Sequence, residues 1–270
     1  MTAPRARALT IAGSDSGGGA GIQGDLKTFG AIGVYGMTAI TAVTVQNTLG
    51  VTEVATIEPS VVAAQVAAVA SDIGVDAAKT GMLATAEIVQ AVAGAIREAG
   101  LEKLVVDPVS VSKHGHLLLE PDALAVLRAE LLPLALLVTP NLPEAEALTG
   151  FPVRTRDDMQ RAGEAIRGEG ARAVLIKGGH LVGGEAADLL IDDDGEEWVV
   201  THRLDTPHTH GTGCTLSAAI AAHLAMGEDL RTAVRAGKVF VTGAIAHALA
   251  IGKGIGPVDQ LWMSPQPERG

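Results

Sequence analysis

Short aliphatic runs alternate with longer runs of helical spacing along almost the whole chain. The run at 7–13 predicts a buried strand, and after a glycine-rich turn the run at 21–33 predicts a helix. The alternation continues with strands expected at 36–46, 51–58, 76–82, 103–109, 135–141 and 171–179, and helices at 59–73, 86–100 and 156–170. Such alternation implies an α/β fold, with a mostly parallel sheet and helices on both faces. Ligands of these sheets bind beyond the carboxyl ends of the strands.

The C-terminal third of the chain predicts a hairpin followed by two helices. The run at 185–202 is apolar on both sides of "DDDGE", which is typical of a β-hairpin turn. Helices are expected at 213–226 and 230–250. The sequence contains no internal repeat, low-complexity tract or long linker, so we predict a single domain over 1–270, with 1–6 and 264–270 as frayed tails.

Composition limits the partners and the compartment of this chain. Hydrophobic residues make up 47% but aromatic residues only 2%, so the core must be aliphatic. The net charge is −11 without a basic block, which argues against nucleic acid and against an anionic membrane surface. No run reaches the ~18 apolar residues of a membrane helix. One cysteine permits no internal disulfide, so a reducing cytoplasm is the expected compartment.

The glycine-rich turn "SDSGGGAGIQGD" contains Gly19, Gly21 and Gly24 in the spacing G-x-G-x-x-G. This spacing is typical of dinucleotide binding when an acidic residue about 20 positions later ends the next strand. Here that strand ends in "TVQNT", without a carboxylate, which disfavours a dinucleotide. Two other interpretations stay open. One is a tight turn that needs glycines at positive φ. The other is a loop whose backbone approaches a flat substrate, with Asp25 presenting a carboxylate from the following helix.

The only cysteine, Cys214, lies in "HTHGTGCT", at the start of an Ala-rich helical run. Gly211 and Gly213 let the backbone turn several N–H groups toward one point. The free N–H groups of a first helical turn, with the helix dipole, form an anion site, and neighbouring threonines add hydroxyl donors. The same field is expected to lower the pKa of the thiol from about 8.5. Taken alone, the residue equally permits a buried cysteine that only fills space.

Several long motifs together resemble one enzyme family. They include "ALTIAGSDSGGGAGIQGDLKTFGAIGVYGM", "TVQNTLGV", "DAAKTGML", "TPNLPEAEALTG", "HTHGTGCTLSAAIAA" and "GKGIGPV". The chain resembles the hydroxymethylpyrimidine/phosphomethylpyrimidine kinases of thiamine biosynthesis, in the ribokinase-like superfamily, over nearly its whole length. The resemblance implies ATP-dependent phosphorylation of the pyrimidine's hydroxymethyl group and then of the resulting monophosphate. It also implies a three-layer αβα fold and a homodimer.

The resemblance assigns the chemistry to the "GTGC" segment. Gly211, Thr212 and Gly213 would form the anion hole around the transferring phosphoryl group. Cys214 stands where sugar kinases of the superfamily have an aspartate base, so it is the candidate base for the substrate hydroxyl. Phosphoryl transfer depends mainly on positioning and charge neutralisation, so the physics supports the anion hole more firmly than the base.

The resemblance also indicates ATP and Mg²⁺ ligands. "TPNLPE" is similar to the family's N-x-x-E element, which organises magnesium through water, and Asn141 and Glu144 fit it. Asp107 ends a strand and is a second candidate carboxylate for Mg²⁺, which prefers oxygen ligands. Lys177 in "IKGGH", with Asn141 and Thr212, is a candidate ligand of the ATP phosphates. Simpler interpretations are a helix start capped by Asn141 and a solvated lysine at a strand end.

For the pyrimidine itself, the resemblance indicates polar contacts from Gly13, Asp25 and Gln46. A carboxylate accepts from an aromatic amino group, and an amide both donates and accepts, which suits an aminopyrimidine. Met82 and Val109 would supply the apolar walls, although Met82 is equally well explained as a core residue.

The chain departs from the family at the rim of the expected pocket. It has "SDSGGGAG" where the family often has "SDPSGGAG", "QGDL" for "QADL", and Ser110 where methionine is common. The histidines His180, His208 and His210 lack the spacing of a zinc site, and we interpret them as polar loop residues.

The sequence leaves three alternatives to a pyrimidine kinase function open. Pyridoxal kinase activity is the nearest, because flat heteroaromatic alcohols of similar size are hard to separate by sequence. A sugar or nucleoside kinase is less favoured, since those enzymes usually keep aspartate at position 214. A non-catalytic sensor of the pyrimidine or of a nucleotide predicts degraded phosphate motifs, whereas "GTGC", "NLPE" and "KGG" are intact.

Overall fold

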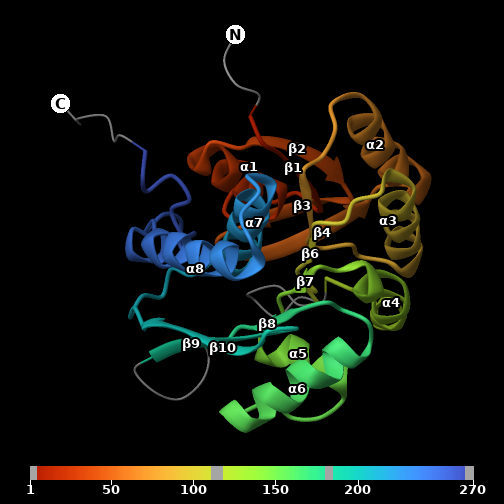
Figure 1. Cartoon of the computed structure of the whole chain (residues 1–270). Coiled ribbons are helices and arrows are strands. Elements are labelled where there is room, and N and C mark those ends of the chain that lie inside the picture. The colour runs from red at the N-terminus through yellow and green to blue at the C-terminus, as the bar shows by residue number, and fades with distance from the viewer. Residues whose placement is uncertain (1–4, 111–117, 180–184, 265–270) are drawn as a thin grey trace, which may run out of the picture.

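The central sheet has eight strands in the order β10-β9-β8-β7-β6-β5-β1-β2 (Figure 1). The structure is a computed structural model that describes residues 5–110, 118–179 and 185–264. The strands are β1 (Arg7–Ala12), β2 (Tyr35–Ile40), β5 (Ala77–Thr80), β6 (Leu104–Val106), β7 (Leu137–Val138), β8 (Val174–Ile176), β9 (Glu185–Asp192) and β10 (Gly195–His202). All pairs from β2 to β8 are parallel, and β9 and β10 add an antiparallel edge. The predicted mostly parallel sheet and C-terminal hairpin are confirmed.

Helices cover both faces of this sheet, which gives the predicted three-layer αβα arrangement (Figure 1). One face carries α1 (Gly21–Ile32), α7 (Thr212–Ala225) and α8 (Leu230–Ala246). The other carries α2 (Pro59–Asp72), α3 (Ala86–Ala99), α4 (Pro121–Val126), α5 (Leu142–Thr149) and α6 (Arg156–Gly168). Among the residues described, no helix is long and apolar enough to span a lipid bilayer.

Successive side chains of each central strand enter the two cores in turn. In β6, Leu104 and Val106 pack under α3 and α4, whereas Val105 packs on the opposite face with the residues of α7. All three are fully buried. This is the period of two that a strand buried on both faces imposes, and it explains why these strands are continuously aliphatic. The core is built from Ala, Val, Leu and Ile, as the composition requires.

The strand predicted at 36–46 is wrong as a single element. β2 ends at Ile40, and β3 (Ala42–Asn47) pairs with β4 (Gly50–Thr56) in a separate two-stranded antiparallel sheet. The chain leaves the main sheet at Thr41, which is fully buried. Its N–H donates to Ala12 O and its hydroxyl to Met82 O, at 3.1 and 2.6 Å. These long-range bonds fix the break, and the run of β-branched residues around it gives no local sign of one.

One helical segment was not predicted from the sequence, and the end of another was predicted incorrectly. The residues after Glu120 form α4, which continues through a widened turn at Leu127–Leu131 and a tight turn at Leu132–Leu134. This stretch is almost continuously apolar, so its period is not readable. The last helix ends at Ala246 rather than at 250.

The helix start that the sequence left open at "TPNLPE" is confirmed. Asn141 caps α5 by accepting from Glu144 N–H at 2.9 Å, and Glu144 accepts from Asn141 N–H at 2.8 Å. This reciprocal capping satisfies two N–H groups that the first turn of a helix leaves without internal partners. It also fixes both side chains at the carboxyl end of β7.

Candidate active site

A cavity of about 570 Å³ lies at the carboxyl ends of the parallel strands. Its wall includes the residues that follow β1, β6 and β7, as expected for this class of sheet. Almost all of the predicted site residues line it: Gly13, Gln46, Met82, Asp107, Val109, Asn141, Glu144, Lys177, Gly211, Thr212, Gly213 and Cys214. Asp25 is the predicted residue that does not. The structure therefore gathers residues from positions 13 to 214 around one space.

The loop before α7 is shaped by Gly211. Its φ of 84° lies in the left-handed region, and a Cβ there would stand 1.9 Å from Gly19 O. Only glycine fits at position 211, because other residues disfavour this φ and because any side chain would clash with Gly19 O. Gly211 is also the N-cap of α7 and has no side chain to satisfy the helix's first N–H groups. These N–H groups and the positive end of the helix dipole face the cavity beside Gly213 and Cys214, which is the geometry of an anion site.

The thiol of Cys214 does not have the lowered pKa that its position at a helix start predicts. Burial raises its pKa to about 11, although the charge of Lys79 and a hydrogen bond from the Gly21 backbone act in the opposite direction. Desolvation of the thiolate by the surrounding protein thus outweighs the helix field. The prediction of a lowered pKa is wrong for this structure, and the thiol is mostly protonated near neutral pH.

Lys177 lies between two carboxylates at the floor of the cavity. Its Nζ is 2.9 Å from Asp107 Oδ1 and 3.7 Å from Glu144 Oε2. Only 14% of the Lys177 side chain is exposed, so its interpretation as a solvated lysine is wrong. Burial alone would lower the pKa of Lys177, but Asp107 and Glu144 reverse this effect and hold it above its usual value. The ammonium group is therefore a permanent cation beside the start of α7.

The two carboxylates near Lys177 differ in their surroundings. Asp107 is buried and also lies 3.3 Å from the hydroxyls of Thr139 and Ser217. Burial raises the pKa of Glu144 to about 7, against the opposing charge of Lys177. No group of three or more His, Cys, Asp or Glu side chains with metal-binding geometry occurs in the described part of the chain.

Other parts of the cavity wall are formed by small and apolar residues. Gly13 leaves space that Met82 occupies, since a Cβ on Gly13 would come within 3.0 Å of Met82 Cε. Met82 packs with Ala42 and Ala84 and also lines the cavity, so both of its interpretations hold. Val109 adds an apolar surface. The tight turn predicted for the glycine loop is confirmed at Gly21, whose φ is +55° and whose Cβ would lie 2.4 Å from Gly13 O.

Asp25 does not present its carboxylate to the cavity. It is fully buried, and its Oδ2 accepts from Lys79 Nζ at 2.9 Å and from the Thr10 hydroxyl at 2.6 Å. The predicted direct contact between Asp25 and the ring is corrected accordingly, because the carboxylate lies behind the wall. Lys79 lines the cavity in its place. Asp25, Cys214 and Asp107 hold the pKa of Lys79 above its usual value, although burial acts to lower it.

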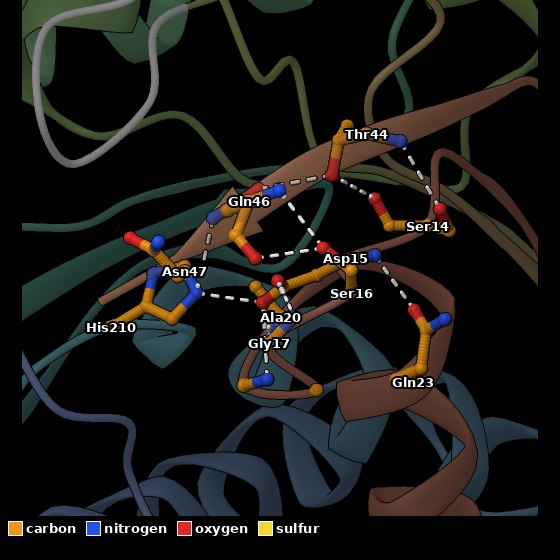
Figure 2. A network of polar contacts seen from close by, with 12 residues as sticks. Ser14, Asp15, Ser16, Gly17, Ala20, Gln23, Thr44, Gln46, Asn47 and His210 are labelled. Carbon is orange, nitrogen blue, oxygen red and sulfur yellow. Dashed lines mark hydrogen bonds and ion pairs between the residues drawn. The ribbon is translucent and has the colours of Figure 1, made fainter. Parts of the chain in front are cut away.

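The glycine loop is organised by Asp15, which sequence reasoning missed (Figure 2). Its carboxylate accepts from the backbone N–H groups of Gly17, Gly19 and Ala20 at 2.8, 3.0 and 2.9 Å. It also lies 2.8 Å from His210 Nε2. Burial would raise the pKa of Asp15, but these hydrogen bonds outweigh it and hold the pKa below its usual value. An acidic residue two positions before a glycine run was the available signal, since Asp commonly accepts from N–H groups of the turn that follows it.

The histidines have separate environments. His210 lies at the cavity wall and is nearly buried, so its interpretation as a polar loop residue misses its contact with Asp15. His208 accepts from Gly256 N–H at 3.0 Å through its Nδ1. His180 lies outside the described residues.

A third buried ion pair, between β9 and α8, also lines the cavity. Lys238 Nζ lies 2.7 Å from Asp188 Oδ2, and Asp188 Oδ1 accepts from Gly178 N–H at 2.9 Å. The pair was not predicted, because neither the hairpin nor the last helix carries a motif that points to the site. It anchors Gly178, the residue that follows Lys177.

Comparison with known proteins agrees with this geometry. A family model described as phosphomethylpyrimidine kinase matches residues 15–259. The hydroxymethylpyrimidine/phosphomethylpyrimidine kinase of Streptomyces coelicolor is 53% identical over 255 residues, which are 94% of each chain.

Two solved structures share the fold. An ADP complex of Bacillus subtilis pyridoxal kinase superposes with a TM-score of 0.90 at 43% identity, over 96% of this chain and 99% of the other. A phosphomethylpyrimidine kinase from Clostridium difficile gives 0.79 at 46% identity, over 88% and 99%. The predicted ribokinase-like kinase family is confirmed: this chain belongs to the phosphomethylpyrimidine kinase family.

Proposed function

We propose that this protein phosphorylates 4-amino-5-hydroxymethyl-2-methylpyrimidine with ATP, and then phosphorylates the monophosphate to the diphosphate, in thiamine biosynthesis. The carrying observation is the position of Cys214 and the first turn of α7. They line the same cavity as Gly13, Met82 and Val109, and Gly213 in this turn lies beside Lys177, since a Cβ there would stand 3.4 Å from Lys177 Nζ. A small ring alcohol and a triphosphate can therefore meet at the start of α7.

The reaction follows from the groups that meet there. The substrate hydroxyl oxygen forms a bond to the γ-phosphorus of ATP, the bond from that phosphorus to the β–γ bridging oxygen breaks, and ADP leaves. The N–H groups of Gly213 and Cys214 and the cation Lys177 stabilise the charge on the transferring group. Cys214 receives the hydroxyl proton as thiolate, a form that the nearby Lys79 favours. Since the pKa of the thiol is about 11, the reactive thiolate is a minor form near neutral pH.

Mg²⁺ fits the charged end of the cavity as a water-bridged ion. Asp107 and Glu144 offer carboxylate oxygens, the ligand type that Mg²⁺ prefers, and their pairing with Lys177 leaves too few free oxygens for an all-protein cage. Asn141 and Glu144 would hold it through water, as their capping geometry fixes both side chains. When bound, the ion would supply charge neutralisation for the triphosphate.

The nucleotide base has room at the end of the cavity bordered by α8. Leu204, Val241 and Ile245 supply apolar surface there, beyond the Asp188–Lys238 pair. The similarity to an ADP complex of pyridoxal kinase supports nucleotide binding in this fold. Asn141, Thr212 and Lys177 are our candidates for contacts with the phosphates.

Pyridoxal kinase activity remains the second candidate, favoured by the high structural similarity to Bacillus subtilis pyridoxal kinase. The deciding experiment measures ADP release from Mg-ATP with the hydroxymethylpyrimidine, its monophosphate and pyridoxal, each over a range of concentrations. We expect the two pyrimidines to give the higher kcat/KM. A kcat/KM for pyridoxal above both would reverse the assignment.

We further propose that the protein is a homodimer of the reducing cytoplasm. β3 turns Val43 and Val45 outward, where they are 47% and 52% exposed, while Ala42 and Thr44, which alternate with them, are buried. Exposed β-branched residues on a short two-stranded sheet are a typical surface for pairing with a second copy. The unpaired thiol of Cys214 supports the compartment.

A further inference from the structure

The chain that follows α8 contains "GKGIGPV", residues 252–258, a motif that none of the contacts inside the cavity explains. Of the described residues after Ile245, none lines the cavity. The segment nevertheless contacts the loops that do line it. Its influence on the reaction must therefore pass through the residues that it holds, rather than through a ligand.

The backbone of this segment is bonded to the loop before α7. Gly256 O accepts from His210 N–H at 3.2 Å, and Val258 N–H donates to His210 O at 3.0 Å. Gly256 N–H also donates to His208 Nδ1 at 3.0 Å. A Cβ on Gly256 would lie 2.1 Å from Leu249 O, so the motif requires glycine at this close approach. These bonds fix the chain immediately before the anion site.

Gln260 adds a side-chain contact from the same segment. Its amide nitrogen Nε2 lies 2.8 Å from Gly19 O and 3.2 Å from Thr215 Oγ1. Because a backbone oxygen only accepts, the amide nitrogen must face Gly19, and its two hydrogens serve the two acceptors separately. Gln260 is only 3% exposed, so bulk water does not compete for either bond.

The two acceptors of Gln260 lie on the two sides of the anion site. Gly19 is in the glycine loop, and its O is the atom that a Cβ on Gly211 would meet at 1.9 Å. Thr215 follows Cys214 in the first turn of α7, is fully buried, and donates its N–H to Gly211 O at 2.9 Å. One amide group thus fixes the first turn of α7 against the backbone that packs on Gly211.

We propose that Gln260 is a positioning residue for phosphoryl transfer, which holds the first turn of α7 where its N–H groups meet the transferring phosphoryl group. It acts through Gly19 and Thr215, because it does not line the cavity itself. Donors stabilise a transition state only if they are already in place, and a misplacement of about 1 Å caused by a distant change can cost up to about 100-fold in rate. This inference rests on the proposed function and specifies what keeps its anion site in position.

The first test replaces Gln260 with Met, which keeps the length of the side chain but donates no hydrogen bond. We expect kcat with the hydroxymethylpyrimidine and Mg-ATP to fall about 10-fold to 30-fold, with both KM values changed by less than about threefold, because the anion site acts mainly in the transition state. Gln260→His should recover most of the rate, since its Nε2 lies as many bonds from the backbone as that of Gln and can donate to Gly19 O.

Gln65→Met is the matched control for the loss of a side-chain amide. Gln65 Nε2 donates to Ile40 O at 3.1 Å and its Oε1 accepts from Ile40 N–H at 2.9 Å, and neither residue lines the cavity. This control should keep its kcat. Thr215→Val, which removes the second acceptor of Gln260 and keeps the shape of the side chain, should lower kcat in the same direction and add nothing in the Gln260→Met background. It carries the test if Gln260→Met does not fold.

Titration calorimetry with nucleotides gives a measure that needs no pyrimidine. Mg-ADP is compared with Mg-AMP-PCP, an ATP analogue that is not cleaved, because the two differ in the terminal phosphoryl group that we place at α7. We expect Gln260→Met to weaken AMP-PCP about threefold to tenfold more than ADP.

Equal changes for the two nucleotides, or a kcat of the Gln260 and Thr215 variants within about twofold of the original, would overturn the inference and leave the proposed function intact. If the unchanged protein does not turn over the pyrimidine, the proposed function fails instead, and the comparison of the two nucleotides still decides the role of Gln260.

Discussion

Lys177 Nζ and Asp107 Oδ1 lie 2.9 Å apart, which joins the loops after β8 and β6 by a buried ion pair at the start of α7. The cation that we assign to the triphosphate is thus already neutralised in the ligand-free protein. Binding of ATP must exchange this carboxylate partner for phosphate oxygens, and Mg²⁺ would offset the charge that Asp107 and Glu144 then carry.

Replacing Lys177 with Met should lower kcat by about 100-fold or more, because a preorganised charge at the transferring group is lost. Steady-state kinetics with saturating pyrimidine and Mg-ATP measure the effect. Lys103→Met is the control, since Lys103 donates to Leu224 O on the surface of α7 and does not line the cavity. A Lys177→Met enzyme with more than half of the original turnover would contradict the assignment.

The rate of the reaction should rise with pH if Cys214 is the base. Its pKa is about 11, so below that value the thiolate fraction, and with it kcat, increases up to tenfold for each pH unit between about 8 and 10. Cys214→Ala should reduce kcat by about 100-fold and abolish this slope. A variant that keeps its fold by circular dichroism and retains near-normal turnover would remove the thiol from the mechanism.

Lys79→Met should destabilise the protein by about 3–5 kcal/mol, because it leaves Asp25 charged and without its ionic partner at a fully buried position. The shift in the midpoint of urea unfolding measures this loss. Adding Asp25→Asn to the same chain removes the unpaired charge and should recover part of the stability. A loss below about 1 kcal/mol in the single variant would show that the pair is not essential to the core.

Gly211→Ala should reduce turnover by about 100-fold, because the new Cβ would meet Gly19 O and the residue would have to leave its left-handed conformation, which displaces the anion site. Gly30→Ala in α1 is the matched control, since a Cβ there meets nothing within 4 Å. That variant should be fully active and up to about 1 kcal/mol more stable. Similar activity of the two variants would argue against the close packing at Gly211.

Val45→Glu should dissociate the proposed dimer, because it places a charge on the outward face of β3. Sedimentation velocity of the wild type and the variant at equal concentration measures the change. Val200→Glu, on β10 and 45% exposed, is the control that should not alter the mass. A monomeric wild type would end the dimer proposal.

Much of the fold could be predicted because the information is local. The spacing of apolar residues identifies each strand and helix from its own sequence. The alternation of these elements then predicts a parallel sheet with helices on both faces. The break at Thr41 was not predictable, because it is fixed by hydrogen bonds to Ala12 and Met82, which are distant in the sequence. At Thr41, contacts with residues distant in the sequence determine where the chain turns, and no turn-forming residue marks the position.

Site residues could be predicted where they lie in a short motif whose local sequence determines its conformation. Cys214 and Asn141 lie in such motifs and line the cavity. The role of Asp15 depends on His210, and the burial of Asp25 depends on Lys79, so these environments exist only after folding. The pKa of Cys214 was misjudged for the same reason, since a helix dipole can be inferred from sequence but desolvation cannot.

The close backbone approach of Gly19 to Gly211 joins the glycine loop to the loop before α7, so it can couple the binding of the two ligands. Gly19 O is held by the side-chain amide of Gln260 at 2.8 Å, so it cannot retreat when the loop before α7 shifts. A shift of the glycine loop on binding of the ring would therefore also shift the loop before α7, where we place the triphosphate. If the alcohol tightens nucleotide affinity by some factor, thermodynamic reciprocity requires the nucleotide to tighten alcohol affinity by the same factor.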